Sequence, residues 1–241
     1  LEFRRVLFRS GTKVWLDSID PDFLRVNIDR GATGATSNPI IVADILKTGR
    51  YDADLARLAA QGLDDEVIAW QLTDMLVRQA QEQFYPIFQT ANCNDGYVSF
   101  ELDPLIEDPA LNLPHDERVR RYIALGRKWS AGHANRMIKV PATPAGIASL
   151  ETLAADGIVL NVTLIFTPRQ YREAREAVWR ELSVGPDRCR GARCTERDGC
   201  YAELARERAG GCQVILVNHA LYLADLALRA ARGGEPVILP D

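Results

Sequence analysis

Five short β-like segments of this chain carry polar residues at or near their ends, and this pattern restricts the fold more than any other feature. They cover residues 14–17, 35–38, 98–101, 136–140 and 160–166. Strand side chains alternate between faces, so Ser99 shares a face with Glu101 and Asn161 shares one with Thr163. Both faces of the strands are buried in a parallel barrel, so polar groups there need partners or a task. Their recurrence favours a functional site.

The segments between these strands have the signals of helices. Thr143 is a candidate N-cap followed by a proline, Gly157 is a candidate C′ residue, and Thr167 repeats the same start. A longer helix is expected after Asp64 and another between residues 116 and 131. Alternating strands and helices predict right-handed parallel βαβ units, which place active groups at the carboxyl ends of the strands of a (β/α)8 barrel.

Lys139 lies in the fourth β-like segment. Removing an ammonium group from water is costly, so burial favours the neutral, nucleophilic amine that forms imines with carbonyl compounds. The alternative is a lysine whose stem is buried and whose ammonium reaches water. The polar ends of the other segments favour the imine hypothesis.

Four motifs occur in an order that resembles the transaldolase family. They are the strand that ends at Asp17, Thr36-Ser-Asn-Pro, Met137-Ile-Lys-Val-Pro-Ala-Thr, and Asn161-Val-Thr-Leu-Ile-Phe. The resemblance runs from about residue 13 to about residue 180. It implies an α/β fold of the (β/α)8 TIM-barrel type.

The resemblance also implies a mechanism and a set of site residues. Lys139 would form a Schiff base with a ketose phosphate such as sedoheptulose 7-phosphate or fructose 6-phosphate, and a dihydroxyacetone unit would pass to an aldose phosphate. The other implied residues are the base Asp17, the water-holding pair Glu101 and Thr163, and the substrate-binding residues Asn38, Asn161 and Thr36. Each also has a simpler interpretation: an arginine partner for Glu101, an ordinary strand residue for Thr163, and caps or turns for the asparagines.

The sequence predicts neither a cofactor nor a metal site. The iminium ion of a Schiff base supplies the polarisation that a divalent ion would otherwise give. The three histidines form no His-Glu-x-x-His pattern, and no Walker-type loop or dinucleotide fingerprint occurs. The cysteines at 189, 194 and 200 lack the Cys-x-x-Cys spacing of a zinc knuckle.

The chain departs from the family pattern after Arg180. Residues 185–200 lack apolar alternation and cannot form a buried strand, and the serine and arginine that would bind a substrate phosphate are not found. A shifted reading frame is one hypothesis for this stretch, and sequencing the genomic locus would test it. We expect an incomplete barrel with about seven recognisable strands, the last two at residues 214–218 and 236–240.

One domain is expected over residues 11–241, with residues 184–211 atypical and poorly ordered, and residues 1–10 resemble an added leader more than native sequence. A length of 241 residues suits one barrel, and 47% apolar residues supply a core. The net charge of −4 gives no reason to expect nucleic acid, and no apolar run is long enough for a membrane span. Five cysteines without a secretory signal fit reduced thiols in the cytoplasm.

The expected partners are sugar phosphates, and formation of a homodimer stays open. Three functions remain: a transaldolase of the pentose phosphate pathway or a fragment of one, a related class I aldolase that releases dihydroxyacetone, and a catalytically inactive remnant. Free dihydroxyacetone as product would favour the aldolase, an exchanged ketose the transaldolase, and cooperative unfolding without turnover the remnant.

Overall fold

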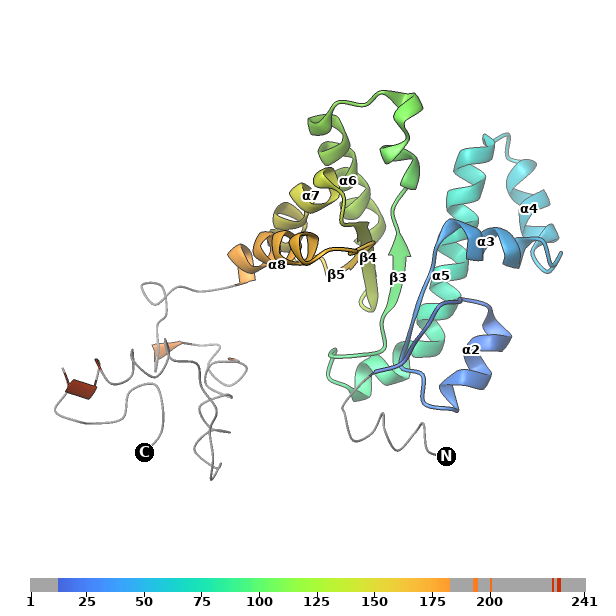
Figure 1. Cartoon of the computed structure of the whole chain (residues 1–241). Helices are drawn as coiled ribbons and strands as arrows, with labels where there is room; N and C mark the ends of the chain where they lie inside the picture. Colours follow the sequence, from blue (N-terminus) through green and yellow to red (C-terminus); the bar gives the residue numbers. More distant parts are fainter. Residues whose placement is uncertain (1–12, 183–192, 195–199, 201–226, 228, 231–241) are drawn as a thin grey trace. The chain divides into compact units, whose positions relative to one another are not determined.

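In the part of the chain that the structure describes, five parallel strands form one sheet. Figure 1 labels three of them, β3, β4 and β5. The computed structural model describes residues 13–182, 193–194, 200, 227 and 229–230. The strands pair in chain order and are β1 (Trp15–Leu16), β2 (Gly34–Thr36), β3 (Val98–Glu101), β4 (Arg136–Pro141) and β5 (Leu160–Thr163). Each predicted β-like segment up to residue 166 overlaps one of them, so this part of the prediction is confirmed.

Within the described residues the sheet is open, with β1 and β5 at its edges, so it forms an incomplete barrel. The register places Glu101 opposite Lys139, and Lys139 opposite Asn161. The strands predicted at residues 214–218 and 236–240 and the atypical stretch at 184–211 lie almost entirely outside the described residues. The described residues up to Leu182 belong to one compact unit, and the single domain over residues 11–241 stays a prediction.

Helices connect the strands, as the alternation predicts. They are α2 (Pro21–Ile28), α3 (Pro39–Leu46), α4 (Asp52–Ala59), α5 (Asp65–Thr90), α6 (His115–Ser130), α7 (Pro144–Ala155) and α8 (Pro168–Leu182), with two 3-10 turns, η1 (Pro104–Glu107) and η2 (Pro109–Leu111). Figure 1 shows α6, α7 and α8 beside β4 and β5, and α5 beside β3. The sequence predicts α5 to α8 and does not resolve the shorter helices.

Local capping groups start the helices where the sequence predicted. The hydroxyl of Thr143 accepts a hydrogen bond from the Gly146 N–H at 3.0 Å, and the carboxylate of Asp64 accepts one from the Val67 N–H at 2.8 Å. Gly157 follows α7 with a φ of 76°, a left-handed conformation that glycine adopts at little cost.

The core lies between the outer face of the sheet and the helices. Val98, Phe100, Ile138 and Val140 are fully buried there. The Phe100 ring stacks on Trp129 with the ring centroids 4.9 Å apart. These apolar contacts hold β3 and β4 in fixed positions, and the two strands carry Glu101 and Lys139 on their inner face.

A buried ion pair lies at the start of β4. The side chain of Arg136 is completely buried, and its Nη1 lies 2.8 Å from Asp74 Oδ1 while its Nε donates to Gln81 Oε1 at 2.9 Å. The guanidinium also lies over the Phe100 ring, 4.9 Å from the centroid. Burial lowers the pKa of Arg136, and the hydrogen bond with Asp74 opposes that shift.

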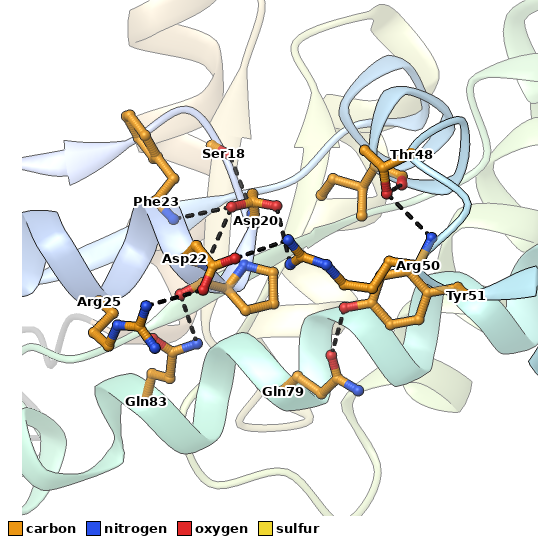
Figure 2. A network of polar contacts seen from close by, with 12 residues as sticks. Ser18, Asp20, Asp22, Phe23, Arg25, Thr48, Arg50, Tyr51, Gln79 and Gln83 are labelled. Carbon is orange, nitrogen blue, oxygen red and sulfur yellow. Dashed lines mark hydrogen bonds and ion pairs between the residues drawn. The ribbon is translucent and has the colours of Figure 1, made fainter.

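A polar network fixes the segment that follows β1 (Figure 2). The carboxylate of Asp20 caps α2, and Arg50 pairs with both Asp20 at 3.4 Å and Asp22 at 2.8 Å. The hydroxyl of Tyr51 donates to Gln79 Oε1 of α5 at 2.9 Å. The start of α2 is therefore tied to the connection between α3 and α4, just beyond Asp17.

Candidate active site

Lys139 lies at the carboxyl end of β4 and is 9% exposed. Its Nζ atom lies 2.9 Å from Glu101 Oε2 and donates a hydrogen bond to the Ser37 carbonyl oxygen at 3.1 Å. These two contacts come from the ends of β3 and β2. The amine is therefore held against protein groups of neighbouring strands instead of reaching bulk water.

One carboxylate oxygen of Glu101 has an ion-pair partner but no aligned hydrogen-bond donor among the described residues. Its Oε2 atom is close enough to Lys139 for an ion pair, yet it is buried without a hydrogen-bond donor among the described residues. An ion pair needs only proximity, whereas a hydrogen bond needs alignment, so both descriptions hold. The simpler interpretation of Glu101 as the partner of an exposed arginine is wrong, because its partner is the buried Lys139. A buried oxygen of this kind calls for a further donor such as a ligand hydroxyl or water.

A row of side-chain hydrogen bonds crosses the inner face of the sheet. The Ser99 hydroxyl donates to Thr36 Oγ1 at 2.8 Å and accepts from Asn161 Nδ2 at 3.2 Å. This row brings together two of the predicted substrate-binding residues through a residue that the sequence analysis did not assign to the site. The signal was available, because Ser99 shares a strand face with Glu101.

Ser37 is a second site residue that was not assigned to the site from the sequence. Both its backbone N–H, at 3.1 Å, and its hydroxyl, at 2.8 Å, donate to the Ser99 carbonyl oxygen. Ser37 is buried, and this double contact fixes the peptide whose own carbonyl accepts from Lys139. Ser37 thus holds the end of β2 against β3 and places an acceptor at the amine.

The remaining predicted site residues, Asn38, Asp17 and Thr163, lie on other elements than Lys139 and Glu101. Asn38 caps α3, since its Oδ1 accepts from the Ile41 N–H at 2.8 Å, which leaves its amide N–H groups for a ligand. Asp17 follows β1 and is exposed, and Thr163 is half-buried at the end of β5. Among the described residues, no hydrogen bond or ion pair joins these three side chains to Lys139. The expected pairing of Glu101 with Thr163 therefore stays a prediction.

A strongly apolar segment follows β5. Leu164 and Phe166 are 51% and 80% exposed, and Leu164 has a φ of 59°, in the left-handed region that leucine rarely adopts. The side chain of Gln170 holds this segment, because its Oε1 accepts from the Phe166 N–H at 3.0 Å and its Nε2 donates to the Ala142 carbonyl at 2.9 Å. Gln170 connects α8 to the end of β4 and was not singled out in the sequence.

The described residues hold no cluster of three or more histidine, cysteine or acidic side chains suited to a metal ion. Among the described helices, none combines the length and the apolar character needed to cross a membrane.

The parallel strand order, the helical connections and the polar groups at the carboxyl ends define an α/β protein of the TIM-barrel type. The sequence profile described as Transaldolase/Fructose-6-phosphate aldolase matches residues 14–204. The chain belongs to this family, which confirms the resemblance that its motifs indicated.

Individual relatives agree with the family assignment. The transaldolase of Mycobacterium tuberculosis strain ATCC 25618 / H37Rv is 35% identical over 179 residues, which cover 71% of this chain and 46% of the relative. The transaldolase of Thermobifida fusca is 35% identical over 177 residues, or 70% and 46% of the two chains, and that of Thiobacillus denitrificans is 35% identical over 182 residues, or 72% and 48%. The chain spans about half the length of the curated relatives it matches.

Proposed function

We propose that this chain carries the Schiff-base site of a transaldolase, which transfers a dihydroxyacetone unit from a ketose phosphate to an aldose phosphate. The observation that carries the proposal is the buried amine of Lys139, 2.9 Å from the carboxylate of Glu101, at the carboxyl ends of parallel strands. Family membership supports it, and so do the relatives that bear the name transaldolase.

In the first stage, the neutral amine of Lys139 adds to the ketone carbon of the substrate and forms a carbinolamine. Glu101 is the nearest group able to accept a proton from the lysine ammonium. Loss of water from the carbinolamine requires a proton on the departing hydroxyl. A water molecule held by Glu101 and Thr163 would carry that proton. The buried Oε2 of Glu101 supports such a role, because it lies 2.9 Å from Lys139 Nζ in a contact that is not aligned as a hydrogen bond.

In the second stage, the protonated imine accepts the electrons of the bond between C3 and C4. Asp17 would remove the proton from the C4 hydroxyl, so that this bond breaks and an aldose phosphate leaves. The remaining three-carbon unit stays on Lys139 as an enamine. Attack of the enamine on the aldehyde carbon of an acceptor, followed by hydrolysis of the new imine, regenerates the free lysine.

A second candidate is an aldolase that releases the three-carbon unit as dihydroxyacetone. The family supports it, because its name includes fructose-6-phosphate aldolase beside transaldolase. In this case water, and not an acceptor aldose, ends the cycle. Product analysis separates the two functions, since an exchanged ketose marks the transaldolase and free dihydroxyacetone marks the aldolase.

The proposal is tested by borohydride trapping with dihydroxyacetone and with fructose 6-phosphate, followed by intact mass measurement and peptide mapping. The sequence contains only four lysines, at positions 13, 47, 128 and 139, so an adduct is assigned without ambiguity. Lys47→Ala is the matched control, because that lysine is exposed and paired with Asp44 at 2.8 Å. We expect the adduct on Lys139 alone. An adduct that persists in Lys139→Ala, or a folded wild type that gives none, would overturn the proposal.

The two ketones report on different parts of the site. Dihydroxyacetone carries no phosphate, so its adduct depends on Lys139 and its neighbours and not on groups that bind phosphate. Trapping with dihydroxyacetone but not with fructose 6-phosphate would favour an assembled catalytic centre without a phosphate-binding segment. Trapping with both would support the complete proposal.

A further inference from the structure

Ser99 is the central residue of the side-chain hydrogen bonds that join Thr36, Ser99 and Asn161 on the inner face of the sheet. It is completely buried on β3, and its hydroxyl contacts Thr36 of β2 and Asn161 of β5. A hydroxyl group has one proton to donate. The contact with Asn161 is made by the amide nitrogen, which can only donate, so the Ser99 hydroxyl accepts there and keeps its own proton for Thr36 Oγ1.

These two contacts decide which group donates and which accepts in the hydrogen bonds that join Thr36, Ser99 and Asn161. The amide nitrogen of Asn161 is engaged with Ser99, so its Oδ1 remains available to accept a hydrogen bond from a ligand. Thr36 accepts from Ser99 and keeps its own proton for donation. If the Ser99 hydroxyl were absent, nothing in this row would distinguish the two amide orientations, which differ by exchange of oxygen and nitrogen.

No neighbouring side chain at this position of the sheet replaces Ser99. The residue opposite it on β4 is Met137, and opposite residues in adjacent strands lie on the same face. A thioether sulfur is only a weak acceptor and has no proton. Met137 therefore cannot donate to Thr36, and it is a poor substitute as the acceptor for Asn161.

We propose that Ser99 is a positioning residue that orients the Asn161 amide, so that Asn161 Oδ1 accepts a hydroxyl of the bound three-carbon unit. The inference rests on the proposed function and makes it more specific. The ligand class is a ketone with a hydroxyl group on a carbon adjacent to the carbonyl. Ser99 itself does not touch the reacting atoms in this scheme and acts through Asn161.

The test compares borohydride trapping on Lys139 with two ketones, dihydroxyacetone and acetone, which lacks hydroxyl groups. In Ser99→Ala we expect the half-saturating concentration of dihydroxyacetone to rise by about tenfold, since a misoriented polar group in the site loses one hydrogen bond. The value for acetone stays unchanged. Ser149→Ala is the matched control, because Ser149 is also completely buried but donates to the Gly146 carbonyl in α7. We expect this control to change neither value.

A double-mutant cycle separates positioning from general damage. If Ser99 acts through Asn161, then Ser99→Ala has no further effect on the preference for dihydroxyacetone in an Asn161→Ala background. Should Ser99→Ala fail to fold, Ser99→Cys provides the same test. A thiol is only a weak donor and a weak acceptor, so this variant holds the Asn161 amide less firmly and is expected to reduce the preference.

The outcomes are distinct. An unchanged preference in Ser99→Ala, or effects of Ser99→Ala and Asn161→Ala that simply add, would overturn this inference while the Lys139 adduct of the wild type stands. Failure of the folded wild type to form any adduct would instead overturn the proposed function, and the inference with it.

Discussion

Asp74→Ala is expected to destabilise the fold strongly, although Asp74 on α5 is partly exposed. Its carboxylate is one-fifth exposed, whereas the Arg136 side chain that it pairs with is completely buried. At 2.8 Å and an effective dielectric constant of ~20, the attraction between the two charges is ~6 kcal/mol before desolvation is counted. Removing one partner of a buried pair typically costs ~3–5 kcal/mol, because the other charge stays buried. Since water reaches Asp74, we expect about 3 kcal/mol.

The assay is urea unfolding followed by tryptophan fluorescence. Trp129 reports directly on this region, because its backbone carbonyl accepts from Arg136 Nη1 at 3.0 Å. Asp54→Ala is the matched control, as Asp54 and Arg57 form an exposed pair at 3.0 Å and such pairs contribute less than ~1 kcal/mol. Arg136→Met in the Asp74→Ala background should recover part of the loss, since it removes the unpaired charge and keeps an apolar chain over Phe100.

If Asp74→Ala lowers the free energy of unfolding no more than Asp54→Ala does, the Arg136 charge does not depend on Asp74 and the prediction is refuted. It also fails if Arg136→Met and Asp74→Ala destabilise additively, because the cost would then not come from an uncompensated charge.

Three further predictions concern the site and its support. Lys139→Ala abolishes the trapped adduct, whereas Asp17→Ala still forms it but slows cleavage of the carbon–carbon bond, as measured by release of the aldose. His133 has a lowered pKa because it is buried and faces Arg136, so the unfolded chain binds its proton more readily. The contribution of His133 to stability is therefore complete above the usual histidine pKa of about 6.5, and it is lost as the pH falls through the lowered pKa of the folded protein. The free energy of unfolding, measured at about pH 7.5 and about pH 5, should depend less on pH in His133→Gln than in the wild type. Gly146→Ala would place its Cβ 2.0 Å from a backbone oxygen at the end of β4, so we expect a loss of at least about 2 kcal/mol in urea unfolding.

For each of these predictions, a control variant or a specified outcome would contradict it. Gly132→Ala is the control for Gly146→Ala, because a Cβ at Gly132 would meet no atom within 4 Å and only its φ of 78° opposes the change. Equal effects of the two would contradict the steric argument. An equal pH dependence in wild type and His133→Gln would show that other groups dominate acid destabilisation. Loss of the adduct in Asp17→Ala would contradict its assignment to the cleavage step.

Local signals in the sequence were sufficient for the strands and for several helix boundaries. The segments 98–101 and 160–166 were identified as β-like, and β3 and β5 lie within them, because apolar and polar residues alternate over 98–101 and 160–163 and that pattern reflects the two faces of a strand. The starts of α5 and α7 followed from Asp64 and Thr143, whose side chains cap the next turn of backbone. The 3-10 turns η1 and η2 and the helices α2 to α4 were not resolved, because short elements carry too few periods of a pattern.

The order of motifs also identified the family, and with it the residues expected in the site. The sequence did not decide between the alternative roles of single residues. Asn38 is a helix cap whatever else it does, and the sequence alone could not decide between a cap and a ligand-binding amide. Glu101 could equally have paired with an exposed arginine, and only the register of β3 and β4 places it against Lys139.

The sequence by itself determined the alternation of strands and helices, the helix caps and the membership of the family. The first two depend on residues close together in the chain, and the family follows from short motifs and the order in which they occur. Only the tertiary structure decided which groups meet. Lys139 contacts the Ser37 carbonyl across 102 positions of sequence, and Ser99 joins Thr36 to Asn161 across 63 and 62 positions. Such contacts depend on strand register, which is set by packing of the whole sheet and not by any local pattern.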